Sequence, residues 1–307
     1  MSAPYVHPLT HHAVLAVHGP DAAKFLQGQL TCNINYLSPN QASLGARCTV
    51  KGRMLASFYI AAQGDGFLLI LPSEQLETLR ADLAKYAVFS KVTISDASAA
   101  WQLFGLSADA ALIDAWQLGE QAGQCVAHEH GLMIRLHDGR ALLCLNSSAD
   151  SSTLLTGLAS ADENTWQLAN IQAGLAEVTA ATRELFIPQM LALQSLGGVS
   201  FKKGCYTGQE IVARMQYLGR LKRHLQRLQA AADTPLQPGM ELFSPVHSSS
   251  VGEVVSVARH GDQQELLAVV QDDAVSAGQL FAGSPDGAPL SVLTLAIHSD
   301  HDRDISR

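Results

Sequence analysis

The pattern of short strands around one helix between residues 45 and 95 constrains the fold more than any other feature of this sequence. Runs rich in β-branched, aromatic and leucine residues predict three strands. The predicted strands are residues 45–49, 54–62 and 67–71. Ser73 is expected to cap a helix whose leucines fall on one face, and a further strand is predicted at residues 92–95. Such a unit packs its helix against one face of an antiparallel sheet.

A second alternation of helix and strand patterns lies between residues 101 and 145. It predicts a helix near residues 109–117 and strands at residues 132–136 and 141–145. This part of the chain is therefore expected to form a second α+β unit. Residues 147–227, which follow it, are predicted to be mainly helical, with a glycine-rich loop at Gly197 and Gly198.

After Arg227 the sequence changes character again. Proline and glycine residues separate short strand patterns, such as those at residues 251–258 and 265–270, and no helical period is visible. These features predict a small C-terminal β-barrel. The expected fold class is α+β, with two α+β units built on antiparallel sheets and a C-terminal barrel.

Length and composition support a folded chain of several domains. The chain has 307 residues, of which 47% are apolar and 16% charged, and this excludes a disordered or strongly polyelectrolyte chain. The predicted domains are a central domain of residues 1–48 and 147–227, a ferredoxin-like α+β domain of residues 49–146, and a barrel domain of residues 228–307. Neither a secretory signal pattern nor an apolar run of membrane-spanning length is visible, so we expect a cytoplasmic protein without membrane contact.

The segment from residue 197 to residue 224 carries most of the candidate chemistry. Thr207 and Glu210 have the spacing of a capping box, which predicts a helix that begins after Thr207. An apolar stripe follows on this helix, and Gly219 is the expected stop. The stripe consists of Ile211, Val212, Met215 and Leu218.

Cys205, two residues before the predicted cap, is the candidate reactive group. The start of a helix and nearby lysines, here Lys202 and Lys203, favour the thiolate form of a cysteine. Such a thiol acts as a nucleophile, a redox sensor or a single metal ligand; the alternative is a small residue packed under a glycine turn. The remaining cysteines fall in strand or helix patterns and are predicted to be buried. They are Cys32, Cys48, Cys125 and Cys144.

Positive charge gathers in the same segment. Residues 201–227 hold seven of the twenty Lys and Arg residues and one acid, Glu210, in a chain whose net charge is −8. Such a run is either a solvated face or a site for anions, whether a polyanionic small molecule or RNA phosphates. Aromatic residues are not interleaved with the cations as they are on a base-stacking surface, which weakens the RNA interpretation.

The residues 203–210, KGCYTGQE, resemble the signature of the YgfZ-type folate-binding proteins. These proteins are related to the glycine-cleavage aminomethyltransferase and to the mitochondrial iron–sulfur assembly factor. The resemblance extends to five further segments and covers the first three quarters of the chain. These segments are residues 24–33, 51–54, 85–94, 186–189 and 197–201.

The resemblance implies three domains in a cloverleaf around a central hole that binds tetrahydrofolate or a derivative of it. It also implies a role in maintaining iron–sulfur enzymes, including one that thiomethylates tRNA. Cys205 matches the characteristic thiol of the family, and Trp166 matches a tryptophan implicated in folate binding. The other residues assigned to the folate are Lys203, Tyr206, Gln209, Glu210 and Arg214. A second folate-binding tryptophan of the family falls at Ala13 here.

One difference from the aminomethyltransferase bears on activity. Such enzymes carry a catalytic carboxylate in the region that aligns with residues 51–57, whereas this stretch holds no Asp or Glu. Without that group, aminomethyl transfer lacks its acid–base or electrostatic partner, so we expect this reaction to be absent.

Two other functions stay open. One is a folate-dependent one-carbon transferase or demethylase, and the other is a module that binds tRNA directly through the cationic segment. DNA is not expected as a partner. His128 and His130 alternate on a predicted strand edge and are expected to be a surface pair, so no metal ligands are predicted.

Overall fold

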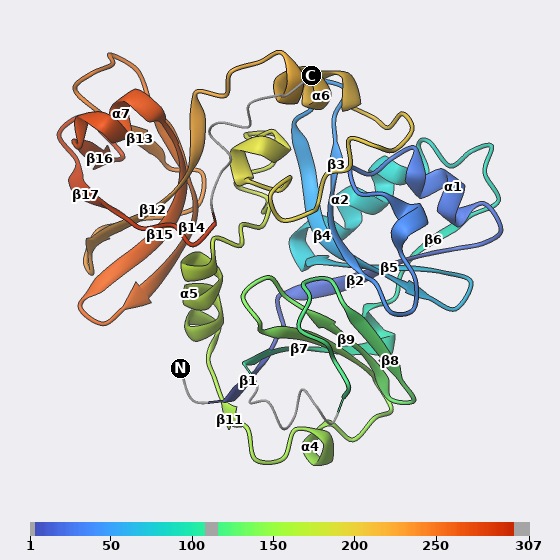
Figure 1. Cartoon of the computed structure of the whole chain (residues 1–307). Helices are drawn as coiled ribbons and strands as arrows, with labels where there is room; N and C mark the ends of the chain where they lie inside the picture. The colour runs from blue at the N-terminus through green and yellow to red at the C-terminus, as the bar shows by residue number, and fades with distance from the viewer. Residues whose placement is uncertain (1–3, 108–115, 298–307) are drawn as a thin grey trace. The chain divides into compact units, whose positions relative to one another are not determined.

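The computed structural model describes residues 4–107 and 116–297 of the chain (Figure 1). The chain divides into two compact units, each made of three stretches of sequence. Unit 1 consists of Met1–Arg47, Ala56–Glu163 and Gly197–Thr207. Unit 2 consists of Cys48–Leu55, Asn164–Leu196 and Gly208–Arg307.

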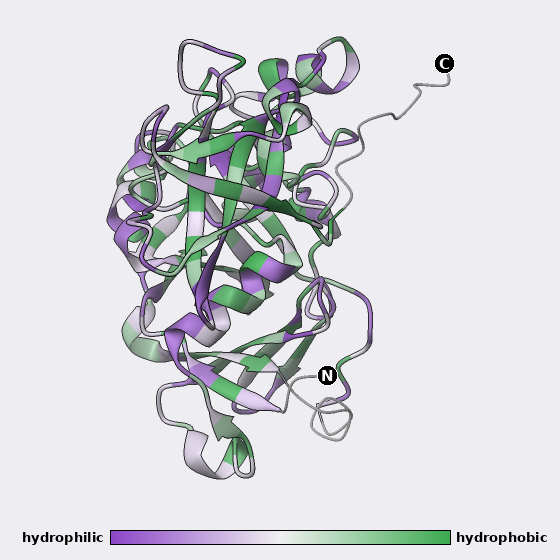
Figure 2. Cartoon of the chain, turned by 90° about the vertical axis from the view of Figure 1, so that its left-hand side faces the viewer, coloured by the Kyte–Doolittle hydropathy of each residue, from purple (hydrophilic) through white to green (hydrophobic). Residues whose placement is uncertain are grey.

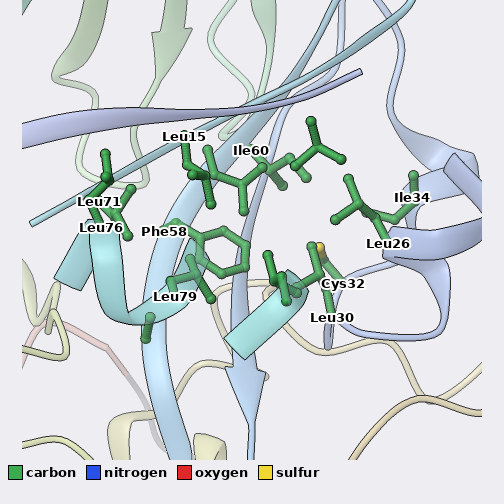
Figure 3. Packing of buried hydrophobic residues seen from close by; sticks show 14 of the residues in the cluster. Leu15, Leu26, Leu30, Cys32, Ile34, Phe58, Ile60, Leu71, Leu76 and Leu79 are labelled. Atoms are coloured by element: carbon green, nitrogen blue, oxygen red, sulfur yellow. The ribbon is translucent and has the colours of Figure 1, made fainter. Parts of the chain in front are cut away.

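A five-stranded antiparallel sheet with the order β3-β4-β5-β2-β6 lies mainly in unit 1. Its strands are β2 (His12–His18), β3 (Ser43–Cys48), β4 (Met54–Gln63), β5 (Gly66–Pro72) and β6 (Thr93–Asp96). The helices α1 (Ala22–Gln27) and α2 (Ser73–Ala84) cover one face (Figure 1). Leucines from both helices meet Leu15, Phe58 and Ile60 of the strands in a closed apolar core (Figure 3).

These elements confirm the predicted unit of three strands, a helix and a further strand, with one difference at the helix start. Ser73 is the first helical residue rather than the cap, and Pro72 occupies the cap position without a side-chain hydrogen bond to the helix. Proline has no side-chain acceptor, so the first amides of α2 receive no side-chain cap from this position.

The second sheet of unit 1 has six strands in the order β11-β1-β7-β10-β9-β8. They are β1 (Tyr5–Pro8), β7 (Trp101–Ser107), β8 (Cys125–His128), β9 (Gly131–Arg135), β10 (Ala141–Asn146) and β11 (Ala159–Ser160). Neighbouring strands are antiparallel except for the short pair β1 and β11. The short helix α4 (Ser151–Leu154) follows β10. The strands predicted at 132–136 and 141–145 are confirmed, while most of the helix predicted near 109–117 lies outside the described residues.

Unit 2 contains the predicted closed barrel, with the strand order β12-β15-β14-β13-β16-β17. The strands are β12 (Arg223–Ala231), β13 (Glu241–Phe243), β14 (Gly252–His260), β15 (Gln263–Gln271), β16 (Leu280–Ala282) and β17 (Ala288–Leu293), and α7 (Asp272–Ala277) follows β15. Alternate residues of these strands fill the interior, and in Figure 2 the strands carry much of the hydrophobic colour. Closure leaves the sheet without free edges. The α+β fold class with a C-terminal barrel is therefore confirmed.

The prediction of a mainly helical stretch at residues 147–227 is wrong. Besides α4, the stretch holds α5 (Glu163–Ala173), the 3-10 turn η3 (Pro188–Leu191) and α6 (Gln209–Tyr217), and β12 begins at Arg223. Gly174 and Gly197 adopt left-handed backbone angles, with φ of 73° at both, and these interrupt helical geometry. The three-domain division stays a prediction; β3, which ends at the proposed boundary, shares its sheet with β4 and β5.

Candidate functional site

The loop that carries Cys205 is attached to the segment after α1 by backbone and side-chain hydrogen bonds within unit 1. The amide of Ser200 donates to the Thr31 carbonyl at 2.9 Å, and the Thr31 hydroxyl donates to the Gly198 carbonyl at 2.6 Å. Further along the loop, the amide of Thr207 donates to the Gly28 carbonyl at 3.2 Å. The loop is thus held at both of its ends.

Lys203 supplies the strongest of these attachments. Its side chain is 8% exposed, and Nζ donates to the carbonyl oxygens of Leu30 and Cys32, both at 2.7 Å. The ammonium also lies 5.1 Å from the ring centroid of Tyr206, which is itself buried. Hydrogen bonds to a charged donor are stronger than neutral ones, and the ring face adds a cation–π attraction.

Burial shifts the pKa values of the Lys203 and Cys32 side chains in opposite directions. Burial lowers the pKa of Lys203 to about 8, against a smaller opposing effect from the Cys32 thiol. The same burial raises the pKa of Cys32 to about 11. Two of the three N–H donors of the Lys203 ammonium are used by these backbone carbonyls, which leaves one donor for a folate carboxylate.

Cys205 is the exposed thiol of the chain. The other four cysteines are buried, which confirms their predicted place in the core. A Cβ atom added to the neighbouring Gly204 would meet no atom within 4 Å, so the loop is open on that side. The structure therefore presents one thiol, on a loop whose adjacent residues Lys203 and Tyr206 are buried.

The predicted capping box is wrong, although the helix exists. The cap position of α6 is Gly208, with φ of 86°, and no side chain caps the helix among the described residues. Thr207 instead places its hydroxyl 3.4 Å from the side-chain oxygen of Gln29. A Cβ at position 208 would lie 2.5 Å from the Thr49 carbonyl oxygen, so glycine is required by both φ and space.

The apolar stripe predicted on α6 is only partly buried. Val212 is fully buried and its carbonyl accepts a hydrogen bond of 2.7 Å from the side-chain amide of Gln189, whereas Leu218 is 85% exposed because the helix ends before it. Gln209 begins the helix, Glu210 is exposed in its first turn, and Arg214 is exposed in its last turn.

Trp166 lies on α5 in unit 2 and is 4% exposed. As placed here, the indole offers almost no free face to a ligand. The structure thus brings Lys203, Cys205 and Tyr206 together on one loop of unit 1. The remaining residues predicted to bind folate lie in unit 2, on α5 and α6.

The seven cations of residues 201–227 do not form one free surface. Lys203 is buried, Arg223 pairs with Glu253 at 3.2 Å, and Arg227 pairs with the buried Glu265 at 2.7 Å. The other four are exposed, and no carboxylate pairs with them within the two described ranges of the chain. They are Lys202 in unit 1 and Arg214, Arg220 and Lys222 in unit 2.

The sequence did not indicate that Leu30, Thr31 and Cys32 hold this loop. These residues hold the loop through backbone carbonyl oxygens and one hydroxyl group, and such contacts have no recognisable motif in a single sequence. The signal available was the resemblance at residues 24–33, which includes these positions without giving their role.

The fold has a counterpart among solved structures. The glycine cleavage system aminomethyltransferase T from Bartonella henselae superposes with a TM-score of 0.74 over 97% of this chain and 87% of that protein. Sequence identity is 18%, so this similarity establishes the fold alone. The class is thus an aminomethyltransferase-like fold. No protein-family model matches the chain.

Curated relatives are closer in sequence. The proteins named tRNA-modifying protein YgfZ from Escherichia coli (strain SE11) and Shigella boydii serotype 18 are each 33% identical to this chain over 290 residues, which is 91% of this chain and 89% of each relative. This chain belongs to the YgfZ family of tRNA-modifying proteins. Within the described residues, no helix has the length and apolar character needed to cross a membrane.

The lowered pKa of Lys203 predicts a pH-dependent stability. The folded protein releases the Lys203 proton near pH 8 and the unfolded chain near 10.5, so the free energy of unfolding rises between these values. The contribution of Lys203 to the free energy of unfolding is fully present above pH 10.5 and is lost as the pH falls through 8. Urea unfolding between pH 7.5 and 10 should show a rise of up to about 3 kcal/mol that is missing in Lys203→Met. An equal slope in both proteins would contradict the assignment.

Proposed function

We propose that this chain supports tRNA modification as an accessory protein for an iron–sulfur enzyme that thiomethylates tRNA, and that Cys205 is its working thiol. The observation that carries the proposal is the exposure of Cys205 on an anchored loop, where it lies between the buried residues Lys203 and Tyr206. The family's name for its members, tRNA-modifying protein, supports the tRNA part of the proposal.

An exposed thiol suits a macromolecular partner. A cysteine that works inside an enzyme pocket is usually shielded, whereas the open space beside Gly204 leaves room for another protein to approach. Cys205 can then contact a cluster, a sulfur carrier or a one-carbon adduct of folate. Thiolate is the reactive form in each case.

A transfer of aminomethyl groups is not part of the proposal. Residues 51–57 hold no carboxylate side chain, and this stretch is where the aminomethyltransferase resemblance expects the catalytic acid. In the structure, the Arg53 guanidinium donates to the Leu185 carbonyl and Ser57 is buried. A shared fold does not carry a shared reaction when the reacting group is missing.

We also propose that the protein binds tetrahydrofolate or a derivative. Support comes from the family resemblance at residues 203–210 and from the aminomethyltransferase-like fold. The flat pterin ring would use an aromatic partner, for which Trp166 is the candidate. Because its indole is 4% exposed, folate binding would have to uncover one face of the ring. The exposed Arg214 would neutralise the glutamate carboxylates.

One prediction of this proposal concerns the Cys205 thiol. In cells that lack the native protein, the chain should restore thiomethylated tRNA nucleosides, measured by mass spectrometry of digested tRNA. Cys205→Ala should lose this restoration because it removes the exposed sulfur and little else. Cys125→Ala is the matched control, since it removes a buried thiol of the same unit. Full restoration by Cys205→Ala would overturn the assignment.

Another prediction concerns the binding of tetrahydrofolate. Titration of tetrahydrofolate into the purified protein should change indole fluorescence in a saturable way, and Trp166→Phe should weaken the binding. Phenylalanine keeps most of the buried volume, which alanine would leave as a cavity that costs about 3–5 kcal/mol. Trp101→Phe serves as the control. Binding that is unchanged in Trp166→Phe would remove Trp166 from the site, and no binding to either protein would refute the folate half of the proposal.

Direct contact with tRNA is a second candidate function, favoured by the exposed cations Arg214, Arg220 and Lys222. If they contact phosphates, tRNA binding should weaken steeply with salt, and Arg220→Ala with Lys222→Ala should reduce the slope of log K against log salt by about two. Arg80→Ala, an exposed cation on α2, should leave the slope unchanged. A salt-independent affinity would exclude this mode of binding.

A further inference from the structure

The tip of the β8–β9 hairpin gathers three metal-ligating side chains away from the Cys205 loop. His128 ends β8, and Glu129 and His130 form the turn before β9. One ligand atom from each, two imidazole nitrogens and a carboxylate oxygen, lie within 4.8 Å of one another. We propose that His128, Glu129 and His130 form a surface site for a divalent transition-metal ion, with zinc as the expected occupant.

The backbone of this turn is fixed from the neighbouring strand. Asn146, at the end of β10, donates its amide to the His130 carbonyl at 2.8 Å and its side-chain amide to the Glu129 carbonyl at 3.3 Å. The next residue, Gly131, packs so closely on β10 that a Cβ atom there would collide with the Cys144 carbonyl oxygen. Two of the three ligands therefore start from a backbone held in place before any ion binds.

The side chains are already near one another. The imidazole rings of His128 and His130 have centroids 5.6 Å apart, and His130 Nε2 lies 3.1 Å from a Glu129 carboxylate oxygen. His128 also contacts the ring of Trp116, with centroids 5.1 Å apart, and Trp116 is 8% exposed. A buried indole limits the rotation of His128, which reduces the entropy lost when a metal binds.

The donor set selects the class of ion. Two imidazoles and one carboxylate match zinc and neighbouring first-row ions, whereas calcium and magnesium prefer oxygen ligands. Around a tetrahedral zinc with bonds of about 2.0–2.2 Å, ligand atoms lie about 3.3–3.6 Å apart. Small rotations of the exposed side chains close the remaining distance. A fourth position stays open to water or to a ligand from another molecule.

The structure also supplies a reporter for this site. Ni²⁺ quenches indole fluorescence at short range, and Trp116 touches a proposed ligand. Titration of Ni²⁺ into the full chain at pH 7.5 should quench part of the emission with a stoichiometry of one. Zn²⁺ should then restore the emission by displacing Ni²⁺. In Trp116→Phe the quenching should disappear while calorimetry still detects one bound Zn²⁺.

Variants decide whether these three residues are the ligands. His128→Ala with His130→Ala should abolish saturable quenching, and Glu129→Gln should weaken Zn²⁺ binding about tenfold or more, because the amide is a poorer ligand. The control is His298→Ala with His301→Ala, which removes the histidines of the C-terminal sequence. Circular dichroism without metal should be the same for the unaltered protein and the variants at His128, Glu129 and His130, since none of these three side chains is buried. Unchanged Zn²⁺ affinity in the double histidine variant, or in Glu129→Gln, would overturn the three-ligand site.

Discussion

The candidate site depends on one buried charge, the ammonium of Lys203 held by the carbonyl oxygens of Leu30 and Cys32. A buried cation is costly unless its donors are satisfied, so the loop has a strong preference for the conformation in which these bonds form. Leu30 and Cys32 are themselves part of the apolar core of the five-stranded sheet (Figure 3). The loop is therefore attached directly to the closed apolar core of unit 1.

This attachment explains how the loop exposes a thiol and still holds it in place. Lys203 and Tyr206 point into the protein, and Cys205, between them, is exposed. A reactive group for a large partner needs both accessibility and a defined position. The proposed accessory role in tRNA modification rests on this arrangement, and residues 51–57 lack the carboxylate that aminomethyl transfer would need.

Local patterns predicted the elements that depend on local physics. The strands β4 and β5 follow from their apolar runs and the glycine turn between them, and the barrel follows from short strands separated by proline and glycine. The start of α6 was predicted wrongly because the Thr207–Glu210 spacing suggests a side-chain cap, while the left-handed Gly208 takes that position. Leu218 fits the helical period but lies beyond the end of the helix.

The sequence predicted which residues form the candidate site but not how they are held in place. The resemblance at residues 203–210 selected Cys205 and its neighbours, but a lysine beside a cysteine gives no indication of where its ammonium points. The acceptors of Lys203 are about 170 positions away in the chain and are backbone atoms, which any residue type provides. The same limit applies to Trp166, whose burial depends on tertiary packing.

Amide hydrogen exchange of the Cys205 loop tests the central claim most directly. In Lys203→Met, residues 200–207 should exchange about tenfold faster or more at pH 7, while the strands of the five-stranded sheet keep their protection. Lys202→Met, which changes the exposed neighbour, should exchange like the unaltered protein. Equal protection of the loop in Lys203→Met would show that the buried ammonium does not hold the loop, and the account of the site would have to be abandoned.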